Sequence, residues 1–293
     1  MSNSNYQKVT AATLLVALGI IYGDIGTSPL YVMKAIIGNR EISKMLVYGG
    51  ISCVFWTLTF QTTFKYIILT LRADNHGEGG VFSLYALIKR FGKGKLVIPT
   101  ILGATTLLAD GIITPPISVA SAVEGLEAII PNLPTVPIVI AILSGLFLFQ
   151  RFGTQKVGFF FGPAMVVWFS MLFILGISQI VIHPEILEAL NPMYAYRLLV
   201  EYPHGFWLLG AVFLCTTGAE ALYSDLGHCG RDNIRITWIF VKTALVINYL
   251  GQGAWIMTQG SQFLDGRNPF YTIMPQWFLI FGIIIATMAA IIA

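Results

Sequence analysis

Long apolar stretches separated by short polar ones follow one another along the whole chain. The hydrocarbon core of a bilayer takes about 20 apolar residues per helix. We therefore expect membrane-spanning helices near residues 13–36, 46–71, 95–122, 136–149, 157–181, 206–222, 238–257 and 277–293. This pattern predicts an all-α, polytopic integral membrane protein with about eight transmembrane helices.

Composition supports the same fold class. Apolar residues make up 56% of the chain and charged residues only 11%, whereas an average soluble domain has roughly 25% charged residues. The three cysteines, Cys53, Cys215 and Cys229, have neither metal-binding nor redox spacing. The bilayer, and no nucleic acid, is therefore the expected partner of this part of the protein.

Basic residues near the predicted helix ends indicate the orientation, because Lys and Arg favour the cytoplasmic side. With the N-terminus inside, ten of them fall on the inner side and five on the outer side. The inner set is Lys8, Arg72, Lys89, Arg90, Lys93, Lys95, Arg151, Lys156, Arg231 and Arg235, and the outer set is Lys34, Arg40, Lys44, Arg197 and Arg267. We expect a plasma-membrane protein with a cytoplasmic N-terminus.

The first predicted span is interrupted by "GDIGTSPLY", residues 23–31. Its glycines lower the cost of leaving helical dihedral angles, and Pro29 removes a backbone donor. Irregular backbone at membrane depth is tolerated only where it is buried in protein or lines a cavity. The stretch predicts a broken helix in which freed carbonyls, Asp24 and the oxygens of Thr27, Ser28 and Tyr31 bind an ion. A proline kink with Asp24 paired to a neighbouring helix is the simpler alternative.

The third long helix carries a polar stripe on an otherwise apolar sequence, "GATTLLADGIITPPISVASA". Gly103, Thr106, Asp110, Thr114 and Ser118 recur at steps of three and four residues, which predicts one face directed at the bundle interior. Small and hydroxyl residues also pack helices together in lipid. Helix packing does not explain Asp110.

A second interruption occurs in "TTGAEALYSD", residues 216–225, where Thr217 and Glu220 flank Gly218. Intramembrane carboxylates are costly and mark functional sites, so Glu220 joins Asp24 and Asp110 as a candidate. The breaks open the first and the sixth predicted spans, as expected if five helices repeat with inverted topology. The first repeat would cover about 11–185, and the second would begin at about 205 and continue through 293.

Five strings together resemble the KUP/HAK/KT family of potassium uptake transporters: "GIIYGDIGTSPLY", "RADNHGEGG", "DGIITPPISVASAVEGLE", "TTGAEALYSDLGH" and "NYLGQGAW". The resemblance implies a LeuT-type fold of the amino acid–polyamine–organocation (APC) superfamily and K⁺/H⁺ symport. It also implies a longer protein of about twelve helices with a cytosolic C-terminal domain. Residues 1–293 would then be the front part of the transmembrane domain, and a homodimer could form through the later regions.

Carried over residue by residue, the resemblance places the transported K⁺ on Asp24, Tyr31, Asp110, Thr114, Thr217 and Glu220. We expect Thr27 or Ser28 to assist Asp24, because hard cations prefer oxygen ligands. Gly111 stands where relatives often have an aromatic residue, so one ligand differs. Three carboxylates around one K⁺ cannot all stay ionised cheaply, which makes Asp110, Glu220 and Asp24 the candidates for carrying the coupled proton.

Three other functions agree less well with the sequence. A transporter of cationic amines with the same fold agrees with Asp24, whereas that residue would repel a carboxylate substrate. A potassium channel would need a filter such as "TVGYG", which the sequence lacks. For an enzyme, "RADNHGEGG" has neither the P-loop Lys-Ser/Thr pair nor H-E-x-x-H spacing. We expect this stretch to be the cytoplasmic turn after the second predicted span. We expect no enzyme activity, no cofactor and no metal beyond K⁺.

Overall fold

The computed structural model describes residues 8–89, 94–130, 133–150, 155–259 and 263–293, and within them every regular element is helical. Three of the basic residues on the predicted inner side, Arg90, Lys93 and Arg151, lie outside the described residues. The first half of the chain forms α1 (Ala11–Ile21), α2 (Gly23–Thr27), α3 (Val32–Ile37), α4 (Lys44–Thr57), α5 (Val81–Lys89), α6 (Val97–Glu124) and α7 (Thr135–Gln150). The second half forms α8 (Gln155–Ile182), α9 (Pro192–Glu201), α10 (Leu209–Phe213), α11 (Ala221–Ser224), α12 (Leu226–Cys229), α13 (Arg231–Thr258), α14 (Pro269–Thr272) and α15 (Leu279–Ile292).

Short non-α turns connect several of these helices. The chain runs on from α4 in a π-helical segment, Leu58–Leu69, and then in a 3₁₀ turn, Thr70–Arg72. Further 3₁₀ turns are Ser28–Leu30, Gly94–Leu96, Gly125–Ala128, Pro184–Leu190, Gly205–Leu208 and Leu214–Thr216.

Four helical stretches of the described residues are long and apolar enough to cross a membrane: Val97–Glu127, Phe160–Ile182, Gly205–Ser224 and Arg231–Thr258. A fifth span results if α1 and the stretch Gly23–Leu30, which meet at an angle of 71°, count as one. Thr135–Leu148 and Leu279–Ile292 are apolar but shorter. The multi-pass, all-helical class is therefore confirmed, whereas the count of about eight helices stays a prediction.

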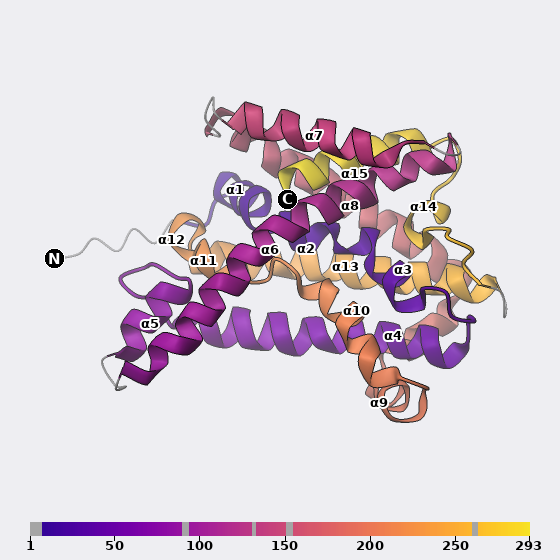
Figure 1. Cartoon of the computed structure of the whole chain (residues 1–293), viewed down its shortest axis with the longest axis horizontal. Helices are drawn as coiled ribbons and strands as arrows, with labels where there is room; N and C mark the ends of the chain where they lie inside the picture. The colour runs from indigo at the N-terminus through magenta and orange to yellow at the C-terminus, as the bar shows by residue number, and fades with distance from the viewer. Residues whose placement is uncertain (1–7, 90–93, 131–132, 151–154, 260–262) are drawn as a thin grey trace.

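Helix α8 packs between α1 and α13 in the centre of the molecule (Figure 1). Glycines permit these close approaches, because a Cβ on Gly19 of α1 would lie 2.6 Å from the backbone nitrogen of Gly162. A Cβ on Gly251 of α13 would similarly lie 2.5 Å from the Cα of Gly176. Small residues bring helix backbones together in lipid, where van der Waals packing drives association. The three helices thus form the scaffold against which the broken segments rest.

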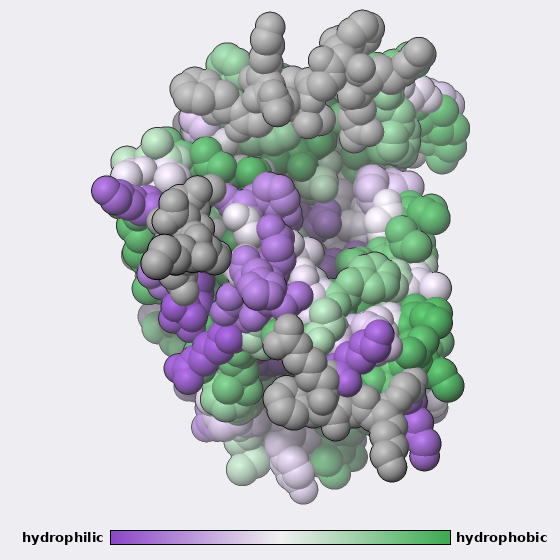
Figure 2. Space-filling view, turned by 90° about the vertical axis from the view of Figure 1, so that its left-hand side faces the viewer, coloured by the Kyte–Doolittle hydropathy of each residue, from purple (hydrophilic) through white to green (hydrophobic). Residues whose placement is uncertain are grey.

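Helices α11 and α12 lie at one end of the molecule, on the left in Figure 1, and α3 and α14 lie toward the other end. We call these the N-terminal end and the far end. Figure 2 views the N-terminal end directly: hydrophilic residues gather over its middle, and hydrophobic residues cover its flanks. A polar end between apolar sides is the arrangement expected of a protein whose flanks face lipid.

Candidate functional site

The first helix is broken next to Asp24. It ends at Ile21, and a bend of 71° separates it from the stretch Gly23–Leu30, in which α2 is followed by a 3₁₀ turn containing Pro29. Asp24 lies in the first turn of α2 and is half-buried. The interruption expected in "GDIGTSPLY" is thus present, and it consists of short helical turns.

Side chains from three other elements bind the backbone carbonyls of this broken stretch. The indole nitrogen of Trp168 on α8 donates to the carbonyl of Gly26 at 2.9 Å. Gln252 on α13 donates to Pro29 at 2.9 Å, and Asn268, just before α14, donates to Leu30 at 2.8 Å. Buried backbone groups need such partners. The sequence pattern did not predict these three donors, although a polar amide in an apolar helix, such as Gln252, is a signal that identifies one.

The predicted hydroxyl ligands next to Asp24 are buried and hydrogen-bonded. Thr27 donates to the carbonyl of Asp24 at 2.9 Å and lies 3.2 Å from the hydroxyl of Ser118 on α6. Ser28 donates to the carbonyl of Leu214 at 3.0 Å. Its hydroxyl also lies 3.3 Å from that of Tyr31. These contacts join the first, third and sixth predicted spans through oxygen atoms.

On α6, the hydroxyl of Thr114 donates to the carboxylate of Asp110 at 2.9 Å. Thr114 and Ser118 are buried, Asp110 is half-buried and Thr106 is exposed. The part of the predicted stripe that contains Thr114 and Ser118 therefore faces the bundle. The prediction that Thr106 also faces the bundle interior is wrong. The reason is that the first half of α6 lies beside α5 at the edge of the molecule (Figure 1).

The sixth predicted span is interrupted between the 3₁₀ turn that ends at Thr216 and α11. Thr217 has an extended backbone, with ψ of 132°, and Gly218 has φ of +81°. Gly218 packs directly on the first break: a Cβ there would overlap that of Asp24 and would lie 3.0 Å from the nitrogen of Ile25. Both breaks thus meet at one point, and Glu220 follows two residues later.

The three predicted carboxylates interact with one another. Asp24 interacts electrostatically with both Glu220 and Asp110, and Glu220 interacts in the same way with Asp110. None of the ion pairs among the described residues includes any of the three. The described residues also contain no compact group of three His, Cys, Asp or Glu that fits a metal ion. Carboxylates at membrane depth are candidates for binding a cation or carrying a proton.

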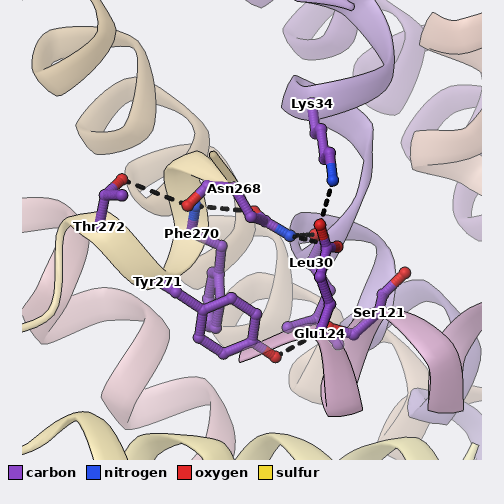
Figure 3. Close-up of polar contacts among 8 residues, drawn as sticks. All are labelled: Leu30, Lys34, Ser121, Glu124, Asn268, Phe270, Tyr271 and Thr272. Atoms are coloured by element: carbon purple, nitrogen blue, oxygen red, sulfur yellow. Dashed lines mark hydrogen bonds and ion pairs between the residues drawn. The ribbon is translucent and has the colours of Figure 1, made fainter. Parts of the chain in front are cut away.

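Toward the far end, an ion pair and an amide tie three elements together (Figure 3). Lys34 of α3 pairs with Glu124 at the end of α6. Asn268 donates to the other oxygen of Glu124 at 3.1 Å, in addition to its bond with Leu30. Tyr271 of α14 donates to the carbonyls of Ser121 and Ala122 at 2.9 and 3.0 Å. We call this set the Glu124 cluster.

A cavity of about 590 Å³ adjoins the Glu124 cluster between α6 and α7. Two carboxylates, Glu124 and Glu127, are among the side chains that line it, together with apolar residues of both helices. The cavity is therefore a mainly apolar hollow with two carboxylates in its lining.

At the N-terminal end, residues 72–80 pack against the segment that follows the second break. The hydroxyl of Tyr223 donates to the carbonyl of Ala73 at 2.5 Å. A Cβ on Gly79 would overlap the carbonyl oxygen of Tyr223, and one on Gly227 would lie 2.5 Å from the carboxylate of Glu78. The "RADNHGEGG" stretch, expected to be a simple turn, is thus fitted closely to α11 and α12.

Comparisons with known proteins agree with one another. Residues 11–293 match the family described as K⁺ potassium transporter integral membrane domain. A "probable potassium transport system protein Kup" from Cytophaga hutchinsonii is 65% identical over 99% of this chain and 45% of its own length. Proteins of the same name from Flavobacterium psychrophilum and Clostridium perfringens are 61% and 49% identical, over 98% and 100% of this chain. The chain spans about half the length of these relatives, and no solved structure matches it.

Proposed function

The chain belongs to the potassium transporter family whose integral membrane domain it matches, and we propose that it forms part of a secondary active importer of K⁺. The relatives' names state potassium transport. The observation that supports this function most is the meeting of two broken helices at Gly218 and Asp24, beside a carboxylate cluster without a basic partner. Discontinuous helices at matching places in two repeats mark transport sites.

In this proposal K⁺ binds between the two breaks. Asp24 contacts the ion directly, with Thr27 or Ser28, Tyr31, Thr114, Thr217 and backbone oxygens as further ligands. Two contacts support an oxygen-lined site. The hydroxyl of Thr114 donates to the carboxylate of Asp110. The hydroxyl of Ser28, in the first broken stretch, donates to the carbonyl of Leu214, just before the second break. The carbonyls of Gly26, Pro29 and Leu30 already accept hydrogen bonds, so their remaining lone pairs would serve the ion only secondarily.

We further propose that K⁺ enters together with H⁺. One K⁺ offsets one of three interacting carboxylates, so a proton on Asp110, Glu220 or Asp24 lowers the remaining repulsion. The electrostatic interaction between Glu220 and Asp110 supports a shared proton on these two. The membrane potential would contribute about 2.3 kcal/mol per charge per 100 mV, and two charges entering together would double it.

The transport cycle we propose is alternating access in a LeuT-type, APC-superfamily fold. The first repeat would cover about 11–185, and the second would begin at about 205 and extend through 293. The N-terminal end would face the cytoplasm and the far end the outside of the cell membrane. The Glu124 cluster and residues 72–80 are fitted to the segments flanking the breaks at the two ends. In this cycle the contacts at the two ends would separate one after the other, because alternating access moves one set of helices against another.

The rival functions have less support. A channel conducts through weak, multi-site binding in a continuous pore, whereas both breaks here converge on one acidic site. A transporter of cationic amines agrees with the carboxylates but not with the potassium transport named for the relatives. Uptake of ⁸⁶Rb⁺ in cells that lack their own potassium uptake systems, with putrescine as competitor, separates the two substrates.

The coupling is tested by ⁸⁶Rb⁺ uptake between pH 5.5 and 8 in Asp110→Asn and Glu220→Gln variants of the full-length protein. We expect at least one variant to lose the pH dependence of the wild type, because it can no longer carry the proton. Unchanged pH dependence in both variants would overturn the proton role of this pair.

A further inference from the structure

A chain of buried amides links the scaffold helix α8 to the first helix break. Asn248 of α13 donates to the carbonyl of Leu172 on α8 at 3.0 Å. Gln252, one turn later, donates to the side-chain oxygen of Asn248 at 2.8 Å and to the carbonyl of Pro29 at 2.9 Å. Both amides are fully buried. Side chains therefore connect the closely packed helices α8 and α13 to the irregular stretch that carries Asp24.

The orientation of Gln252 is fixed by these two bonds. Both use its amide nitrogen, which has two hydrogens to donate, and both receiving atoms are acceptors. Turning the amide over would place its oxygen against two other oxygens. The amide oxygen of Gln252 has no hydrogen-bond partner among the described residues, although it is buried. Leaving such an acceptor unpaired is costly, so the two donated bonds outweigh that cost.

The position of the Pro29 carbonyl explains why the break needs this donor. This carbonyl lies in a 3₁₀ turn, where regular α-helical bonding does not continue. An unpartnered carbonyl at membrane depth would favour rotation of the peptide or closure of the break into regular helix. The hydrogen bond from Gln252 satisfies this carbonyl and fixes it at the point where the chain turns toward Tyr31. Asp24 and Tyr31 lie on the two sides of this turn.

We propose that Gln252 is a positioning residue of the cation site: it holds the Pro29 peptide, and with it the spacing between Asp24 and Tyr31, against α13 and α8. This inference rests on the proposed function, because the quantity it sets is the affinity for the transported cation. Helix α13 would then influence the affinity for the cation through Gln252, without touching the ion.

Two substitutions separate positioning from general stability. Gln252→Met keeps the length of the side chain but donates no hydrogen bond. Gln252→Glu can donate one bond when protonated and none when ionised. Its titration is distinguishable from that of its surroundings, where the interacting ionisable groups are Tyr31, Tyr249, Cys215, Asp24 and Asp110. The two phenols and the thiol ordinarily titrate above pH 8, and comparison with the wild type at each pH removes the contributions of Asp24 and Asp110.

The experiment measures the KM and maximal rate of ⁸⁶Rb⁺ uptake by the full-length protein between pH 5.5 and 8, with immunoblots of the membrane fraction. We expect Q252M to raise KM about tenfold at every pH, the effect of one lost hydrogen bond, with a smaller change in maximal rate. For Q252E, the KM relative to wild type should fall toward one as the pH decreases. The control is Q276E, at an exposed position before α15, whose relative KM should not depend on pH.

A relative KM for Q252E that is constant with pH, or a wild-type KM in Q252M, would overturn the inference. Because the Q252E values at different pH come from one membrane preparation, reduced folding cannot produce the pH trend. Q252E therefore decides the question even if Q252M does not accumulate. A wild-type protein that takes up no ⁸⁶Rb⁺ would instead refute the proposed function.

Discussion

The backbone of Gly218 rests on Asp24: a Cβ at position 218 would overlap the Cβ of Asp24 and lie 3.3 Å from its Cα. Gly218 also has φ of +81°, a left-handed conformation that side chains disfavour. The sixth predicted span can therefore turn at Gly218 and remain in contact with the first break. Both are possible only because residue 218 has no side chain. This contact joins two discontinuous helices into one site.

Replacing Gly218 by alanine should separate the two breaks. The left-handed conformation costs about 1–2 kcal/mol for a residue with a Cβ, and the overlap with Asp24 adds to that cost. We expect Gly218→Ala to reduce ⁸⁶Rb⁺ uptake at least about tenfold, since a small misplacement at a site has such effects. Uptake normalised to the amount of protein in the membrane is the measurement.

The matched control lies on the same segment. A Cβ on Gly210 of α10 would have no neighbour within 4 Å, so Gly210→Ala should transport like the wild type. If Gly218→Ala transports as well as Gly210→Ala, the close contact with Asp24 does not determine activity.

The ion pair between Lys34 and Glu124 should stabilise the protein more than an exposed pair does. Their side chains are 35% and 21% exposed, compared with 54% and 55% for Lys44 and Glu188. Exposed pairs contribute little. A double-mutant cycle with Lys34→Gln and Glu124→Gln, measured as thermal stability in detergent, should give a coupling of about 1 kcal/mol.

The same cycle on Lys44→Gln and Glu188→Gln is the control and should show no measurable coupling. Equal coupling in both pairs would mean that the Glu124 cluster does not hold the far end together. The comparison is direct because both pairs join elements distant in the sequence and both substitutions remove charge without changing side-chain length greatly.

Residue types inside the apolar spans predicted the breaks and the carboxylate candidates. Glycine and proline interrupt a helix locally, and an acidic residue inside a membrane span marks a functional site. These signals placed the interruption at 23–31 and the turn at Gly218, both of which the structure contains. The hydrogen-bond donors to the broken stretch could not be predicted in the same way. Trp168, Gln252 and Asn268 come from elements 140 or more residues away, and only the fold brings them to Gly26, Pro29 and Leu30.

Exposure along α6 and the role of residues 72–80 also depended on tertiary structure. The stripe that ends in Thr114 and Ser118 predicted a buried face, but Thr106 is exposed because α6 leaves the bundle toward its beginning. Likewise, the glycines of "RADNHGEGG" indicated a turn, whereas their contact with Tyr223 depends on where the sixth segment ends. Local patterns identify a turn but not what packs against it.

Residues 72–80 should respond differently to alanine at two of their glycines. A Cβ on Gly79 would overlap the carbonyl oxygen of Tyr223, whereas one on Gly77 would have no neighbour within 4 Å. Gly77 instead has φ of +88°. We expect Gly79→Ala to detach the stretch from α11 and to increase its cleavage by protease added to the N-terminal side of membrane vesicles.

Gly77→Ala tests backbone strain without steric overlap, so its cleavage should increase less than that of Gly79→Ala. A larger increase in Gly77→Ala would show that turn conformation, and not contact with Tyr223, holds residues 72–80 in place.

One cation should bind where the two breaks meet. The most direct test is the anomalous density of Rb⁺ in crystals of the full-length protein, compared with the Asp24→Asn variant. We predict a peak between Asp24, Asp110 and Glu220 in the wild type and its loss in the variant. A peak elsewhere in the protein, or no peak at this point at a Rb⁺ concentration that saturates uptake, would contradict the account.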